Sequence, residues 1–103
     1  MRRARVSVLG APAGTLEERE SGRWLFRYDP GYAGPPVSLT MTVERTEHEF
    51  AGFPPFFEGL LPEGDMLEGL LRQRKIDRND LFAQLVAVGA DTVGAVTVAE
   101  VSA

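Results

Sequence analysis

The apolar residues of this chain change their spacing near residue 55, and this change restricts the folds that it can adopt. In the segment 4–9 the apolar Val6 and Val8 alternate with the polar Arg5 and Ser7. Such alternation places one set of side chains on each face of a strand. After residue 55 the apolar residues return every three or four positions, as on one side of a helix. The order predicts an α+β fold, in which a small, mainly antiparallel sheet packs against two short helices.

The alternation and the helical spacing together place seven elements. We expect strands at residues 4–9, 13–19, 23–28, 37–43 and 93–99, and helices at residues 66–75 and 78–88. In the fourth strand the side chains expected to face inward are Val37, Leu39, Met41 and Val43. The predicted core includes Trp24, Phe26, Leu70, Leu81 and Leu85.

Polar residues and glycine suggest where the two helices begin and end. Asp65 is expected to cap the first helix, with Glu68 three residues later completing a capping box. Asp77 is expected to cap the second helix, and Gly89 to end it in a left-handed conformation.

Composition limits both the architecture and the function. The length of 103 residues fits one domain, residues 1–103. The net charge of −4 disfavours direct binding to nucleic acid, which requires clustered positive charge. The absence of cysteine excludes disulfides, thiolate zinc sites and cysteine nucleophiles. No apolar run approaches the ~18 residues of a membrane span, and the basic start lacks a signal-peptide core, so we expect a cytoplasmic protein.

No group of side chains in the sequence indicates catalysis, a metal or a cofactor. The acids Glu58, Glu63, Asp65 and Glu68 surround a helix start, where capping and the helix dipole account for them. His48 is the only histidine, and its charged surroundings predict a solvated loop residue. A hydrolase using Glu58 or Glu63 would need a partner residue and an apolar pocket, and the sequence offers no such partner.

The stretch from residue 53 to residue 67 carries more apolar side chains than one short turn can easily bury. Phe56 and Leu60 are four apart and should share one side, while Phe57 and Leu61 share the next. Two interpretations stay open, a purely internal role and a division between core and an exposed protein interface.

Three ordered motifs give the chain a resemblance to a known family. Over about residues 4–99 it resembles the N-terminal subdomain of the HipA toxin kinases. The residues that carry this resemblance are Phe26-Arg27-Tyr28, then Pro55-Phe56-Phe57 with Leu60-Leu61-Pro62-Glu63-Gly64, and finally Gly89, Asp91, Gly94 and Ala95.

The resemblance implies a binding role without catalysis. In HipA-like kinases this subdomain precedes the kinase core, and no phosphate loop or catalytic Asp/Asn pair is present here. In three-gene HipBST systems the kinase HipT lacks the subdomain, and a separate small antitoxin, HipS, supplies it. A separate chain with its own Met1 resembles HipS. The resemblance implies inhibition of a HipT-like serine/threonine kinase, in a complex with a HipB-like DNA-binding protein.

The resemblance also suggests where the partner binds. The expected partner-binding residues lie in the stretch from 56 to 66, and they are Phe56, Phe57, Leu60, Leu61, Pro62, Glu63, Asp65 and Met66. Met66 and the neighbouring acids are expected to reach toward a kinase cleft lined with basic groups. The alternative is a detached N-terminal subunit of a split HipA-like kinase that supports its activity.

Overall fold

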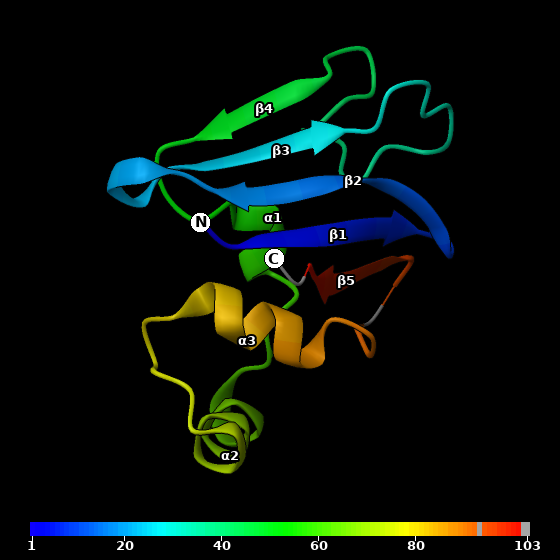
Figure 1. The fold of residues 1–103 in the computed structure, drawn as a ribbon. Coiled ribbons are helices and arrows are strands. Elements are labelled where there is room, and N and C mark those ends of the chain that lie inside the picture. The colour runs from blue at the N-terminus through cyan, green and yellow to red at the C-terminus, as the bar shows by residue number, and fades with distance from the viewer. Residues whose placement is uncertain (93, 102–103) are drawn as a thin grey trace.

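The structure, a computed structural model, describes residues 1–92 and 94–101. Its centre is an antiparallel sheet in the order β4-β3-β2-β1-β5 (Figure 1). The strands are β1 (Arg3–Val8), β2 (Ala11–Glu18), β3 (Trp24–Tyr28), β4 (Glu47–Phe50) and β5 (Val96–Glu100). The predicted α+β class and the mainly antiparallel sheet are confirmed. The predicted start of the last strand, Val93, lies outside the described residues.

Three helices accompany the sheet. They are α1 (Pro55–Glu58), α2 (Gly64–Arg74) and α3 (Leu81–Val88), and a short 3₁₀ helix, η1 (Glu20–Gly22), joins β2 to β3. Side chains of α1 and α3 enter the same core as the inner face of the sheet. The helix α2 packs against α3 and lies beyond it, far from the sheet (Figure 1). Among the described residues, none of these helices is long and apolar enough to cross a membrane.

The alternation of β1 and β3 places apolar residues in the core as predicted. Val6 and Val8 of β1 are buried, and so are Trp24, Phe26 and Tyr28 of β3. Phe57, Phe82 and Leu85 from the helices close the core on that side. Leu25, on the opposite face of β3, is also buried, between its cross-strand neighbours Glu17 and Glu49.

Two predicted core residues lie outside the core instead. Leu70 and Leu81 are only half-buried, and α2 contains no buried residue at all. The apolar residues of α2 are therefore only partly covered, and the helix packs against α3. The predicted burial of Trp24, Phe26 and Leu85 is confirmed.

The predicted strand 37–43 is wrong, because this segment forms an anchored turn. The amide of Met41 donates to the carbonyl of Ser38 at 3.1 Å, and the hydroxyl of Ser38 accepts the amide of Thr40 at 3.1 Å. Val37 and Met41 are buried, whereas Leu39 is 92% exposed at the tip of the turn. The buried Tyr28 hydroxyl holds the turn, since it accepts from the Val37 amide and donates to the Met41 carbonyl.

On the side of β3 away from β2, the neighbouring strand is β4, formed by the charged segment Glu47–Phe50. His48 belongs to this strand, so its prediction as a solvated loop residue is wrong. The His48 ring is half-buried, lies 3.0 Å from the carbonyl oxygen of Thr42 through Nε2 and packs edge-on against Tyr28. An edge strand is only partly covered, which explains its charged composition.

The helix ends differ from the predicted caps. Glu63, with no side-chain hydrogen bond, precedes α2, so the predicted box of Asp65 and Glu68 does not form. The cap of α3 is Asp80, whose carboxylate accepts the Ala83 amide, and not Asp77. Gly89 ends α3 with a right-handed φ of −59°. A side chain is excluded there for another reason, since a Cβ on Gly89 would collide with the carbonyl of Val98.

Candidate functional site

The stretch predicted to bind a partner begins with the single turn of α1. Pro54 and Pro55 start this turn, and a proline at the first helical position costs no backbone hydrogen bond. The amides of Glu58 and Gly59 donate to the carbonyls of Pro54 and Pro55 at 3.1 and 3.0 Å. Phe57 is fully buried and lies 6.1 Å from the Phe26 ring. One aromatic side chain thus fixes α1 on the sheet.

The rest of the stretch becomes more exposed toward α2. Three apolar side chains, Phe56, Leu60 and Leu61, are half-buried and pack at the margin of the core. The Phe56 ring contacts Phe57 edge-on at 5.3 Å. The pair Phe57 and Leu61 is therefore not an inner pair, because Leu61 is only half-buried, like Phe56 and Leu60. Pro62 is also half-buried.

The last three predicted residues are displayed at the start of α2. Glu63, Asp65 and Met66 are all exposed, and Met66 retains 76% of its accessible surface. Gly64 begins the helix with φ 60°, a conformation that suits glycine. A large apolar side chain so far out of the core contributes little to folding. We call the seven predicted residues that keep accessible surface, Phe56, Leu60, Leu61, Pro62, Glu63, Asp65 and Met66, the 56–66 surface. The eighth predicted residue, Phe57, is buried beneath it.

The acids near this surface do not form a catalytic arrangement. Glu58 and Glu63 are exposed, whereas a general acid requires an apolar pocket. Glu68 accepts two hydrogen bonds from the guanidinium of Arg78, at 2.7 and 2.6 Å. These bonds lower the pKa of Glu68 below its usual range. In residues 1–92 and 94–101, no three acids or histidines cluster in a way that could hold a metal ion.

Comparison with known proteins shows which family has this geometry. The family model of the HipA N-terminal domain matches residues 4–99. The chain belongs to the HipA N-terminal domain family. A solved structure of the N-terminal domain of HipA toxin has a TM-score of 0.78 and 28% identity, with 99% of this chain and 94% of that chain covered.

Two relatives carry this HipA N-terminal domain in chains of different length. An uncharacterized protein of Haemophilus influenzae is 32% identical over 100 residues, which cover 97% of this chain and 93% of the relative. A protein of Sinorhizobium fredii that is provisionally named as a kinase, Y4dM, is 30% identical over 103 residues. That alignment covers 90% of this chain and 25% of Y4dM. The domain therefore occurs both nearly alone and as a quarter of a longer protein.

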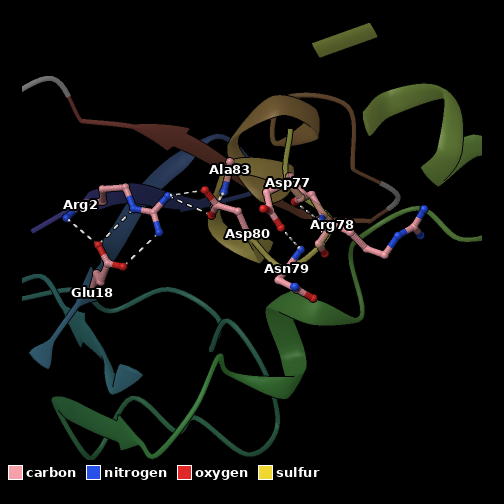
Figure 2. Close-up of polar contacts among 8 residues, drawn as sticks. Arg2, Glu18, Asp77, Arg78, Asn79, Asp80 and Ala83 are labelled. Carbon is pink, nitrogen blue, oxygen red and sulfur yellow. Dashed lines mark hydrogen bonds and ion pairs between the residues drawn. The ribbon is translucent and has the colours of Figure 1, made fainter. Parts of the chain in front are cut away.

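A polar cluster that the sequence did not indicate holds the start of α3 against the sheet of this HipA N-terminal domain. Arg2 lies between Glu18 and Asp80, as Figure 2 shows. Its guanidinium donates to the Asp80 carboxylate at 2.9 and 3.0 Å, and to Glu18 at 3.1 and 3.0 Å. The same guanidinium lies 4.9 Å from the centre of the Phe82 ring. We call Arg2, Glu18 and Asp80 the Arg2 clamp.

The clamp is an electrostatic contact at the protein surface. The hydrogen bond to Glu18 is the main cause of the raised pKa of Arg2, and it lowers the pKa of Glu18 in turn. A carboxyl whose pKa falls on folding stabilises the fold at neutral pH and loses this effect as the pH falls through the folded value. The side chains of Arg2 and Asp80 are 39% and 32% exposed, so solvent moderates the attraction.

Asp80 has two functions, and two substitutions should separate them. Asp80→Ala removes both the cap of α3 and the bonds from Arg2, and loss of a cap alone costs about 0.5–2 kcal/mol. Asp80→Asn keeps a good capping side chain, so we expect a clearly smaller loss of unfolding free energy. Urea unfolding of both variants measures the difference. Equal losses in the two variants would show that the cap contributes nothing.

Proposed function

We propose that this chain is an antitoxin that binds a HipT-like serine/threonine kinase and inhibits it by docking, with no catalytic activity of its own. It acts in the cytoplasm together with a HipB-like DNA-binding protein. Membership of the HipA N-terminal domain family supports a kinase-related role. The nearly full-length match to the small Haemophilus protein supports a role for the domain in a short chain.

The observation that carries the proposal is the exposure of Met66. Its side chain keeps 76% of its accessible surface at the first turn of α2, and half-buried apolar residues precede it in the chain. An isolated domain gains nothing from an apolar side chain held in water. A partner with an apolar pocket gains affinity from it, because flexible thioether side chains adapt to such pockets.

Charge beside Met66 suits a basic kinase cleft. Glu63 and Asp65 precede it in the chain and are both exposed. A kinase cleft binds phosphate groups through basic side chains and backbone amides. Acids at the rim of an interface mainly raise the rate of association, while the buried apolar anchor determines the rate of dissociation. In this mechanism the 56–66 surface blocks the cleft without any chemical step.

A second candidate function has its own support. Because the domain occupies a quarter of Y4dM, a protein provisionally named as a kinase, a detached copy would support kinase activity in trans if it completed a split enzyme. Both functions require binding to a kinase that lacks this domain. They predict opposite effects of binding on activity.

Co-expression with such a kinase distinguishes the two functions. We expect the kinase alone to stop bacterial growth, and co-expression of this chain to restore it. A kinase with its catalytic Asp replaced should be harmless with or without this chain, which is the control. Growth arrest that requires both proteins would overturn the antitoxin proposal and favour the split kinase.

A further inference from the structure

We propose that Arg2 is a positioning residue for the 56–66 surface: it fixes α3 on the sheet and, through α3, holds α2 in the orientation that presents Met66. This inference rests on the proposed function only where it concerns partner binding. The structural part of the inference is that the side chain of Arg2, which directly precedes β1, controls the orientation of the helices. This part rests on contacts within the chain.

The backbone of Arg2 is itself fixed, so its side chain acts from a defined point. The Arg2 carbonyl accepts the Glu18 amide at 2.9 Å, which continues the pairing of β1 with β2. Glu18 then holds the guanidinium from the side of the sheet. The remaining donor atom, Nη1, points to both oxygens of Asp80 (Figure 2). A planar guanidinium with two bound carboxylates has little freedom to turn.

Through Asp80 the clamp fixes the start of α3 and its packing. Asp80 is the N-cap of this helix, and the Arg2 guanidinium lies over the ring of Phe82 in the first turn. Phe82 stacks on Trp24 at 5.5 Å, and Trp24 contacts Phe53 edge-on at 5.0 Å. Phe53 precedes α1 in the chain, so a series of ring contacts connects the clamp with the N-terminal end of the 56–66 surface.

From α3 the constraint passes to α2 through the connection between the two helices. The buried side chain of Gln84 donates to the carbonyls of Asp77 and Arg78, at 3.3 and 2.9 Å. Arg78 in turn forms the two-bond ion pair with Glu68 of α2. Because α2 has no buried residue of its own, its position depends on this ion pair and on its packing against α3. Met66 lies in the first turn of α2, at the far end of this path.

Three variants of the full chain test the inference by hydrogen exchange. Arg2→Gln removes the charge and the bidentate contact, Arg2→Lys keeps the charge, and Arg3→Gln removes the same charge from the exposed neighbour as a matched control. Loss of charged hydrogen bonds should speed exchange about tenfold for the hydrogen-bonded amides of residues 83–84 and 67–74 in Arg2→Gln. Exchange in β3 should not change, Arg2→Lys should be intermediate, and Arg3→Gln should match the unmodified chain.

Binding to the kinase without this domain supplies the second measurement. We expect Arg2→Gln to weaken binding about tenfold, Arg2→Lys less, and Arg3→Gln not at all. The inference would be overturned if the amides of α2 and α3 exchanged at the same rate in Arg2→Gln as in Arg3→Gln. It would also be overturned if Arg2→Gln raised the exchange rate in β3 as much as in the two helices. If the unmodified chain does not bind the kinase, the proposed function fails, and the exchange pattern alone decides the role of Arg2.

Discussion

We expect Leu85→Ala to lower the free energy of unfolding by about 2–5 kcal/mol. Leu85 lies in α3 with no accessible surface, in the core that this helix closes against the sheet. The substitution removes three buried carbon atoms, and the surrounding Phe82 and strand residues cannot fully fill the space. Denaturant unfolding followed by far-ultraviolet circular dichroism measures the loss.

Leu70→Ala is the matched control, because it deletes the same atoms from the neighbouring helix. Leu70 is half-buried on α2, and alanine favours helices, so we expect a loss below about 1 kcal/mol. Similar losses at both positions would contradict the description of α3 as a core helix and of α2 as an outer one.

The second large effect concerns binding. We expect Met66→Ala to abolish neutralisation of the partner kinase, since truncation of a central apolar anchor typically costs more than about 2 kcal/mol of binding. The fold should be unaffected, because the Met66 side chain is 76% exposed. Growth during co-expression measures neutralisation, and the unfolding midpoint checks the fold. Asp65→Ala should have a smaller effect, as expected for an acid at the rim.

Phe56→Asp tests the half-buried part of the same surface. Phe56 is the more exposed of the two adjacent rings, because Phe57 is fully buried. We expect this variant to stop neutralisation too, but with some loss of stability from its contact with Phe57. If every substitution from 56 to 66 either unfolds the chain or leaves it fully protective, the stretch is core and the docking surface lies elsewhere.

The sheet could be predicted where side chains alone decide the pairing. In β1 the alternation is strict and burial follows it, and in β3 only Leu25 departs from it. The segment 37–43 shows the same alternation, yet Ser38 accepts hydrogen bonds from the amides of Thr40 and Met41, and these bonds favour a turn. The strand that pairs with β3 there is Glu47–Phe50, and this charged segment shows no apolar alternation that would predict a strand. Local competition of this kind is not visible from the period of the pattern.

The partner-binding surface stays a prediction from its motifs, and the contacts that hold it in place could not be predicted. The apolar excess in residues 53–67 left open a purely internal role and a division between core and interface, and the structure leaves Met66 exposed. Which ring is buried depends on the packing of α1 against Phe26, which no local pattern encodes. The Arg2 clamp joins residues 78 positions apart in the chain. A pairing over that distance follows only from the completed fold.

The affinity of the purified chain for a HipT-like kinase tests docking through the 56–66 surface most directly. Titration calorimetry should compare the unmodified chain with Met66→Ala and with Leu39→Ala, which truncates an apolar side chain that is 92% exposed outside this surface. We predict tight binding that Met66→Ala weakens by about thirtyfold or more and Leu39→Ala leaves unchanged. Equal affinities of all three proteins, or a loss confined to Leu39→Ala, would contradict the proposed surface.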